Sequence, residues 1–558
     1  SSPMSEAVGQ SSEDKETAPG QLAYADANSI SQLIDEKYSD WSRLRYIFER
    51  DQYRNILYYA GNQWVTYDKG SKQWRRKALP TWFPRPVTNK FAEKANDIIA
   101  ALRRPTFSYS PTSDDMASVA MAEVGSKVEQ VLWKEADMKA RETLLKAWLV
   151  ITGNVFLYTT YDEPDETEPY GTVALPGFKC PMCGYSDIFD KPPAGCPQCP
   201  PQPGQAGMDE MGQPIMGAPV PQPMEPTDIE VPKGKLIAEI VSPFELYADP
   251  AVPSFEQLTG VMRIRSFPLA DAKQLAKKLF PAAKMDELVS GGEPRSTSKL
   301  YQESLAYVTA TYGSMGGGIP APGIIQSPTV SLFELWLLPT DQYPQGLYAF
   351  RIGGTPDLTK GMPLPSKRRN GSCFLPFVHF GGDIIPGRFW RKTRLDDLVY
   401  KQNQRNQTEA VISLIATRMG APGWLLPKGC GVGGISGEPG FKLWYTAISS
   451  GGTVPLKPER FSGEQIPQTL LLWLNKIDDD IERVAGTFFL GGGDTPPGVT
   501  AASALAYLGE RAQRSMSPWT QAYEDGFARW FEQAMEIFRT RAPEPRVLIT
   551  GGQNRWET

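Results

Sequence analysis

The sequence predicts an α+β fold that is mainly helical. Apolar residues recur at helical spacing over long stretches, of which 89–102 and 114–151 are examples. Shorter runs rich in β-branched and aromatic residues, such as 155–161 and 236–241, are typical of strands. The chain has 558 residues, of which 41% are hydrophobic and 22% are charged. A chain of this length and composition can build a large core, which excludes a wholly disordered protein.

The N-terminal part is predicted to hold helices joined by aromatic loops. Residues 1–28 are acidic, rich in Ser and without the apolar stretch of a signal peptide, so we expect a flexible arm and no secretion. Residues 29–59 show the pattern of one long helix or a broken pair. The segment 63–87, with its tryptophans and prolines, indicates loops and short strands. Helices at 89–102 and 114–151 should then pack as one layer.

A proline-rich segment, 176–233, interrupts the first β region. It contains 14 of the 50 prolines of the chain, which an ordinary core element does not tolerate. We interpret it as an insertion that consists of a cysteine-bearing knuckle, 177–200, and a mobile Pro/Gly-rich linker, 201–233. The strand pattern resumes at 236–241, and this strand should pair with 155–161. The insertion would then project from the edge of a sheet.

Residues 242–385 mix helix and strand signals. A short helix is expected at 269–280, and strands are expected at 305–311, 330–338 and 347–352. This part is therefore also predicted to be α+β.

The C-terminal part returns to helical patterns. A helix at 391–419 has a middle, 401–407, that is polar on every face and therefore needs water or a polar neighbour. A Gly-rich β segment at 422–458 separates it from a second helix at 468–485. The apolar stripe of that second helix consists of Leu470, Trp473 or Leu474, Ile477, Ile481 and Val484.

A glycine-rich loop at 487–500 leads to the last helical region. Its helix is expected to open with Thr500 as the N-cap, to be interrupted at Pro518, and then to resume with an aromatic stripe. Residues 541–558 hold only a short strand-like piece at 547–550. The aromatic stripe consists of Tyr523, Phe527, Trp530, Phe531, Met535 and Phe538.

Charge and residue content exclude several classes of function. The chain has 58 Lys and Arg against 63 Asp and Glu, a net charge of −5, which disfavours a protein that grips nucleic acid over a broad basic face but allows transient DNA contact. The single histidine, His379, is expected to be structural, so a histidine-based catalytic triad or metal centre is disfavoured. The sequence contains no G-x-x-x-x-G-K-[ST] motif, so an ATP-driven role needs a partner. No apolar run is long enough to span a membrane.

Four cysteines form the one strong local motif. Cys180, Cys183, Cys196 and Cys199 follow the pattern C-x2-C-x12-C-x2-C. Two turns that each present a pair of thiolates can close a tetrahedral site around Zn²⁺, and such a closed site is structural. A rubredoxin-like iron site, disulfides and free thiols stay open as alternatives. Cys373 and Cys430 lie far away in the sequence and are expected to be ordinary buried cysteines.

Several short motifs stand in a fixed order along the chain. They are Gly61-Asn62-Gln63-Trp64, Arg85-Pro86 with Asn89, Arg104-Pro105, 111–115, the stretch 241–250 (Val-Ser-Pro-Phe-Glu-Leu-Tyr-Ala-Asp-Pro) with Arg263 and Arg265, Pro386-Gly387-Arg388, 481–491 and Pro518-Trp519. In this order they resemble the portal proteins of short-tailed bacteriophages, the rings through which DNA enters and leaves the capsid. The resemblance covers about residues 30–540, excluding the insertion.

The resemblance implies a portal-type subunit with a wing, long stem helices, a small β clip and C-terminal helices. Such subunits assemble as a ring, usually of about twelve copies, around an axial channel. The segments that correspond are the wing at 29–390, stem helices at 391–419 and 465–486, the clip at 420–464, the tunnel loop at 487–500, wing or crown helices at 501–540, and a crown segment or tail at 541–558.

The resemblance also implies partners. The ring would assemble in the host cytoplasm and occupy one capsid vertex of the virion, without catalytic activity and without a membrane. Its partners would be further copies of itself, the double-stranded DNA in its channel, the terminase large subunit, adaptor or tail proteins and the major capsid protein. The zinc knuckle is not needed for this role, and would stabilise the wing or contact a neighbouring subunit or the capsid.

The resemblance also indicates candidate residues for the wall of the channel. A channel for a moving polyanion must not bind phosphates tightly, so a net acidic wall with a few basic side chains is suitable. The alternative interpretation is that these basic side chains are solvated or paired between subunits. Likewise, the glycine-rich loop at 487–500 is alternatively an ordinary connection between helices. The candidates are Lys392, Arg394, Lys401, Arg405 and Lys476 for DNA contact, and Gly491, Gly492, Gly493, Asp494 and Thr495 in the tunnel loop.

Two other functions remain alternatives. One is another oligomeric virion component, such as an adaptor or a capsid-associated protein. The other is a zinc-dependent hydrolase or nuclease that uses scattered carboxylates, such as Asp396, Asp397 and 478–480. A catalytic zinc keeps an open coordination position, whereas four cysteines fill it, so the enzyme is the less favoured of the two.

Overall fold

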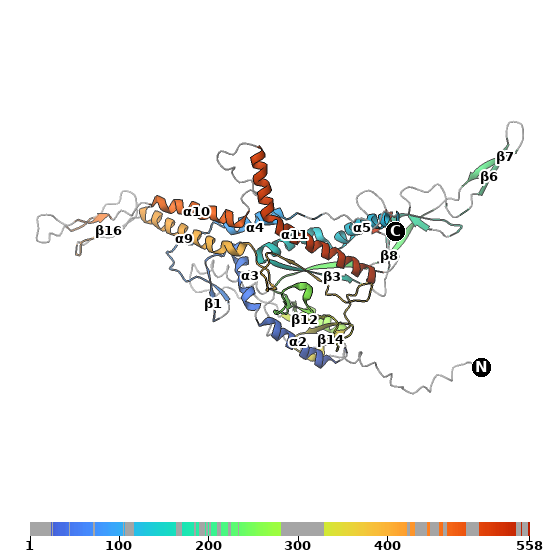
Figure 1. The fold of residues 1–558 in the computed structure, drawn as a ribbon, viewed down its shortest axis with the longest axis horizontal. Helices are drawn as coiled ribbons and strands as arrows, with labels where there is room; N and C mark the ends of the chain where they lie inside the picture. The colour runs from blue at the N-terminus through green and yellow to red at the C-terminus, as the bar shows by residue number, and fades with distance from the viewer. Residues whose placement is uncertain are drawn as a thin grey trace.

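The computed structural model of the chain shows a body from which two long features project in opposite directions (Figure 1). One feature is a pair of helices, and the other is an arm of β strands. None of the helices in the described part of the chain is long and apolar enough to cross a membrane. The described residues are 24, 26–43, 45–70, 73–103, 105, 116–162, 170–183, 186–188, 196, 199, 202–208, 214–220, 225–232, 234–280, 329–420, 424–429, 444–446, 457–460, 466–486, 502–542, 548–549 and 556–557.

The first helical stretch is a broken pair, α2 (Ala27–Ser42) and α3 (Arg45–Tyr59). The Asp26 carboxylate caps α2 by accepting from the backbone N–H groups of Asn28 and Ser29, both at 3.2 Å. Helix α2 therefore begins at Ala27, inside the range 1–28 that we predicted for the flexible arm.

A hairpin and a third helix follow as predicted. Strands β1 (Val65–Asp68) and β2 (Gln73–Arg76) pair antiparallel in the aromatic segment. Helix α4 (Lys90–Ala101) is capped by Asn89, whose Oδ1 accepts from the N–H of Ala92 at 2.9 Å.

The single long helix expected at 114–151 is wrong. The structure has two helices there, α5 (Met116–Glu135) and α6 (Met138–Thr152). Asp137 between them has a positive φ of 48°, a left-handed conformation that ends one helix and lets the next begin at an angle. The apolar periodicity continues across the break, which is why the sequence pattern did not reveal it.

The first β region forms a three-stranded antiparallel sheet in the order β15 (Phe377–Gly381), β3 (Asn154–Asp162) and β9 (Lys235–Val241). Phe156 pairs with Val241 and Asp162 with Lys235, so the strands that flank the insertion are neighbours, as predicted. The insertion therefore leaves the body between two paired strands.

A second, five-stranded antiparallel sheet completes the body, and α7 (Leu269–Leu279) lies between two of its strands in chain order. The predicted strands at 330–338 and 347–352 and the helix at 269–280 are confirmed within a residue or two. The predicted strand at 305–311 lies outside the described residues. The strands in sheet order are β10 (Leu246–Ala248), β11 (Gly260–Pro268), β12 (Thr329–Leu337), β13 (Leu347–Ile352) and β14 (Thr359–Met362).

The insertion, which we call the β-arm (163–234), contains strands in the part that we expected to be a Pro/Gly-rich linker. Figure 1 shows its strands reaching far from the body, with β6 and β7 farthest out. Antiparallel pairing joins β4 to β5 and β8, and β6 to β7. In two- and three-stranded ribbons the edge strands leave N–H groups unpaired, so proline is accommodated. The strands are β4 (Tyr170–Lys179), β5 (Ser186–Ile188), β6 (Gln202–Met208), β7 (Pro214–Val220) and β8 (Glu225–Pro232).

The opposite feature, which we call the helix pair, consists of α9 (Leu395–Gly420) and α10 (Gln468–Ala485). The two helices lie side by side, and strands β16 (Trp424–Leu425) and β17 (Glu459–Arg460) pair antiparallel at their far end (Figure 1). Helix α9 alone is about 39 Å long at 1.5 Å per residue. Residues 421–423, 430–443, 447–456 and 461–464 of the predicted clip lie outside the described residues.

Two details of the helix pair differ from the prediction. Helix α9 begins at Leu395 instead of 391, because Lys392 is held in a bridge with Asp383 and the Thr393 hydroxyl donates to the carbonyl of Val150 at 2.5 Å. On α10 the buried stripe continues through Ala485, whereas Val484 is exposed.

The last helix, α11 (Ala502–Arg541), is continuous through Pro518, so the predicted interruption is wrong. Proline removes one backbone hydrogen bond and bends a helix without having to end it, and Figure 1 shows a clear bend along α11. The aromatic stripe is confirmed, since Tyr523, Phe527 and Trp530 are fully buried. A short pair of strands, β18 (Leu548–Ile549) and β19 (Trp556–Glu557), follows.

The largest hydrophobic core lies between α11, the three-stranded sheet and the helices α4 to α6. Trp133 of α5 packs on the stripe of α11, with its ring 5.3 Å from that of Phe527. The roots of α9 and α10 join the same core through Leu398 and Ile481. The helix pair is therefore anchored in the body by the main core.

Candidate functional sites

The four motif cysteines come together in the β-arm. Their Sγ atoms all lie within 4.8 Å of one another, with Cys180 and Cys199 3.7 Å apart and Cys183 and Cys196 3.5 Å apart. A disulfide needs about 2.05 Å, so these pairs are not disulfides. A tetrahedral ion with Zn–S bonds of about 2.3 Å places its sulfurs about 3.8 Å apart. The four thiols therefore fit the ligand set of one metal ion.

The local backbone prepares this site for a cation. Cys180 and Cys183 lie in the turn after β4, where the backbone N–H groups of Cys183 and Met182 lower the pKa of Cys180 to about 6. The neighbouring sulfurs, Cys183 first among them, raise the pKa of Cys199 to about 12. The Cys180 thiolate therefore forms readily, whereas a second thiolate beside it is disfavoured by charge repulsion. A bound cation would neutralise these charges and stabilise all four thiolates.

The remaining cysteines are not part of this cluster. Cys373 is half-buried instead of buried, and its thiol donates to the carbonyl of Gln345 at 3.4 Å. Cys430 lies outside the described residues.

The polar middle of α9 has polar neighbours, as the sequence requires, and they come from the same chain. Gln402 is fully buried, and it accepts from the N–H of Phe91 at 3.1 Å and donates to the carbonyl of Thr88 at 2.9 Å. Asn406 donates to Oε1 of Gln63 at 2.7 Å. These bonds satisfy side chains that would otherwise be costly to bury beside α4.

Three of the five candidate basic residues form ion pairs within the chain. Lys401 lies 2.7 Å from Asp480, and Lys392 lies 2.5 Å from Asp397. Arg405 is 6% exposed and is held between two carboxylates, with its Nε 2.6 Å from Asp478 and its Nη1 2.5 Å from Glu409.

The other two candidates have different surroundings. Arg394 donates to Sδ of Met516 at 3.4 Å, and the ammonium of Lys476 lies 5.6 Å from the ring centre of Trp473. The tunnel-loop candidates 491–495 lie outside the described residues. The prediction that these residues contact DNA therefore stays a prediction.

The candidate carboxylates for an enzyme do not gather into a metal site. Asp478 and Asp480 are paired with Arg405 and Lys401, and Asp397 with Lys392. Across the described part of the chain, the cysteine cluster is the one group of metal-binding side chains that lies close enough to hold an ion.

The single histidine is structural, as predicted. His379 of β15 is buried, and its ring packs against those of Phe156, at 4.6 Å, and Phe389, at 5.6 Å. Its Nε2 lies 3.1 Å from Oδ1 of Asn154, which can only accept, so the ring donates there. Burial lowers the pKa of His379 to about 3, and the ring is neutral at physiological pH.

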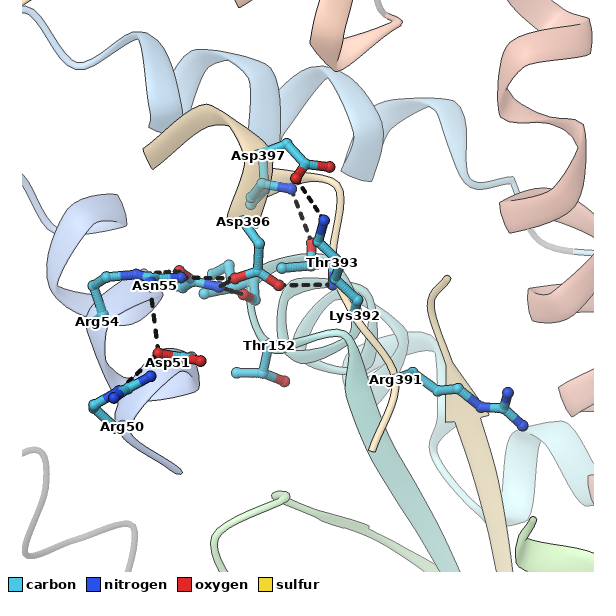
Figure 2. Close-up of polar contacts among 12 residues, drawn as sticks. Arg50, Asp51, Arg54, Asn55, Thr152, Arg391, Lys392, Thr393, Asp396 and Asp397 are labelled. Atoms are coloured by element: carbon cyan, nitrogen blue, oxygen red, sulfur yellow. Dashed lines mark hydrogen bonds and ion pairs between the residues drawn. The ribbon is translucent and has the colours of Figure 1, made fainter. Parts of the chain in front are cut away.

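A polar cavity, which the sequence did not predict, lies where the helix pair joins the body. This root pocket has a volume of about 250 Å³ and is formed by α3, the end of α6, the segment 388–392 and the start of α9. Asp396 is central to it, since it accepts from Arg54 at 2.9 Å, from Asn55 at 2.8 Å and from the N–H of Thr393 at 3.3 Å (Figure 2). The pocket escaped prediction because its residues come from three segments that are far apart in the sequence.

Exposed apolar side chains gather on the helix pair and at its far end. Leu472 of α10 is 60% exposed and Trp444, in the segment between β16 and β17, is 79% exposed. Contiguous exposed apolar surface usually marks an interface with another macromolecule. The other large apolar side chains exposed there are Val411, Met419, Leu425, Leu426, Tyr445, Leu471, Trp473 and Val484.

Neither a protein-family model nor a curated protein matches this sequence.

Proposed function

We propose that this chain is the subunit of a bacteriophage portal, a ring-shaped channel at one capsid vertex through which DNA is packaged and ejected. The observation that carries the proposal is the helix pair with its terminal strands. Two antiparallel helices leave an α+β body, end in a small β element, and return to the body before a long C-terminal helix. That is the order of wing, stem, clip and C-terminal helices in the family that the sequence motifs resemble.

The surface of the helix pair supports association with further copies. Leu471, Leu472 and Trp473 form a consecutive exposed run on α10, although α10 already buries Ile477 and Ile481 against the body. A helix that is apolar on two faces suits a place between two neighbours. In a ring, each helix pair would offer this second face to the adjacent subunit.

The ion pairs of the helix pair support passage of DNA without tight binding. Each phosphate that a protein neutralises adds affinity by releasing counterions, which would stall a moving duplex. Lys401 and Arg405 are already neutralised by Asp480 and Asp478 within the chain. In the proposed ring, the terminase large subunit would dock during packaging, adaptor or tail proteins would dock afterwards, and the major capsid protein would surround the ring.

We further propose that the four cysteines bind a structural Zn²⁺ ion. The sulfur spacing suits four Zn–S bonds, and an all-cysteine set leaves no open position for a substrate. Two-stranded ribbons such as β6 with β7 are marginally stable on their own. A bound metal would therefore stabilise the β-arm, as the hydrophobic core stabilises the body.

Electron microscopy of the purified protein tests the portal proposal. We expect closed rings with an open axial channel. The Leu472→Asp variant places a charge on the exposed face of α10 and should reduce the fraction of closed rings by at least about tenfold. Val119→Asp, which changes an equally apolar and exposed residue on α5, is the matched control and should leave the rings intact. Discrete monomers of the wild-type protein would contradict the proposal.

A further inference from the structure

The root pocket contains more positive charge than its carboxylates neutralise. Asp51 lies 3.0 Å from Arg50 and 3.5 Å from Arg54, and Arg54 also reaches Asp396. Asp397 is paired with Lys392. Every carboxylate that lines the pocket therefore has a cationic partner.

Two cations that line the pocket, Arg388 and Arg391, have no such partner among the described residues. Figure 2 shows Arg391 turned away from Asp396 and Asp397, which leaves Arg388 as the candidate. Its guanidinium lies 4.2 Å from the ring centre of Phe48, and no carboxylate lies within ion-pair distance among the described residues. Its Nε atom is buried without a hydrogen-bond partner there. Burial lowers the pKa of Arg388, although Asp396 and Asp51 act against this shift from a distance. Stacking on Phe48 fixes the plane of the guanidinium, which favours recognition of a planar or tetrahedral oxyanion.

A second unpaired polar group lines the same cavity. Gln52 is 6% exposed, and its carboxamide makes no hydrogen bond within the described part of the chain. A carboxamide that lines a cavity can donate a hydrogen bond to a ligand oxygen. Gln52 and Arg388 come from α3 and from the segment before α9, so they face one cavity from two sides.

We propose that the root pocket binds an oxyanion, a carboxylate or phosphate group, through Arg388 and Gln52. A cation is disfavoured because the three lining carboxylates are already neutralised. A cavity of about 250 Å³ is larger than one phosphate ion and leaves room for the rest of a small molecule or for an acidic side chain of a second copy of this chain. This site does not depend on the portal proposal, since the residues that form it all belong to one chain.

Titration calorimetry of the full-length protein with inorganic phosphate, at constant ionic strength, tests the proposal. We expect Arg388→Gln to weaken phosphate binding roughly ten- to a hundredfold, and Gln52→Leu to weaken it by a smaller factor. Arg368→Gln is the matched control, because Arg368 also stacks on a phenylalanine ring, 5.9 Å from the ring centre of Phe374, but does not line the root pocket. Tryptophan fluorescence melting of each variant verifies that it is folded.

Native mass spectrometry on the same samples distinguishes the two sources of the oxyanion. Phosphate binding without a change in oligomer mass indicates a free small-molecule ligand. An acidic side chain of a second copy is indicated if Arg388→Gln, or added phosphate, lowers the oligomer mass. The proposal is overturned if Arg388→Gln binds phosphate as the wild type does, or if the wild type binds none and Arg388→Gln assembles normally.

Discussion

The body and the β-arm of this protein are held together by different physical means. In the body, α11 and the three-stranded sheet share a continuous core in which Tyr523, Phe527 and Trp530 are fully buried. The β-arm consists of two- and three-stranded ribbons, and four clustered thiols are its most specific feature. Isolated ribbons of two strands are marginally stable in water. In our proposal, a metal bound by the four thiols stabilises the β-arm, as the hydrophobic core stabilises the body.

Metal removal should separate the two regions most strongly. A Cys180→Ser and Cys183→Ser double variant, or strong chelation, is expected to unfold the β-arm, because structural zinc contributes apparent binding free energies of about 10 kcal/mol or more. The body should melt as before. None of the 14 tryptophans lies between 163 and 234, so tryptophan fluorescence reports on the rest of the chain, and limited proteolysis reports on the arm.

The control for that experiment is Cys373→Ser, which changes a cysteine outside the cluster and should leave the arm resistant to protease. Elemental analysis should find one zinc per chain in the wild type. Visible absorption of an iron–thiolate site would identify iron instead, and a protease-resistant arm in the double variant would show that the arm does not need the metal.

Loss of a core aromatic side chain should destabilise the body, which metal removal leaves unchanged. Trp530→Ala is expected to lower the free energy of unfolding by about 3–5 kcal/mol, because a fully buried ring and its hydrogen bond to Thr159 at 3.0 Å are lost. Denaturant titration followed by fluorescence measures this change. Glu524→Ala, an exposed position on the same helix, should change stability by less than about 0.5 kcal/mol. Similar effects of the two substitutions would contradict the assignment of the core.

The buried histidine should make the body sensitive to mild acid. The folded protein holds His379 neutral with its pKa lowered to about 3, whereas an unfolded histidine has a pKa of about 6.5. The resulting stability is present above pH 6.5 and is lost as pH falls toward 3. We expect the free energy of unfolding to drop by about 2 kcal/mol from pH 7 to pH 5 through this residue.

The histidine effect is measured by comparing the pH dependence of unfolding in the wild type and in His379→Gln. The chain has no other histidine, so the difference between the two curves isolates this side chain. Parallel curves between pH 7 and pH 5 would show that His379 titrates alike in the folded and unfolded states.

A smaller contrast is expected between the two ion pairs of the helix pair. Arg405→Gln should destabilise the protein by about 1–2 kcal/mol, because Arg405 is nearly buried and its loss leaves Asp478 and Glu409 without their cation. Lys401→Gln should cost less than about 1 kcal/mol, since both partners in its pair are more than a quarter exposed. Equal effects in urea titrations would show that burial does not decide the strength of these pairs.

Local patterns predicted elements well wherever one face of an element is buried. The limits of α10 and β13 agree with their apolar periodicity, and the pairing of β3 with β9 followed from the strands on both sides of the insertion. The predicted helix limits were wrong where the backbone conformation, and not the side-chain pattern, determines where a helix ends. Asp137 breaks a periodic stretch by its φ angle, and Pro518 bends α11 without ending it.

The candidate sites divide in the same way. The cysteine cluster was predictable because all four ligands lie within 20 residues of sequence and their spacing is characteristic of a metal site. The root pocket was not, because Gln52 and Arg388 meet only through tertiary packing. The intrachain partners of Arg405 were likewise hidden, since Asp478 lies on another helix.

The mass of the native assembly tests the portal proposal most directly. Native mass spectrometry of the wild-type protein should give a closed oligomer of about 740 kDa for twelve subunits of 61.7 kDa, or one subunit more or fewer. A species of 61.7 kDa, or a dimer, that persists at micromolar concentration would contradict the account of this chain as a ring-forming portal subunit.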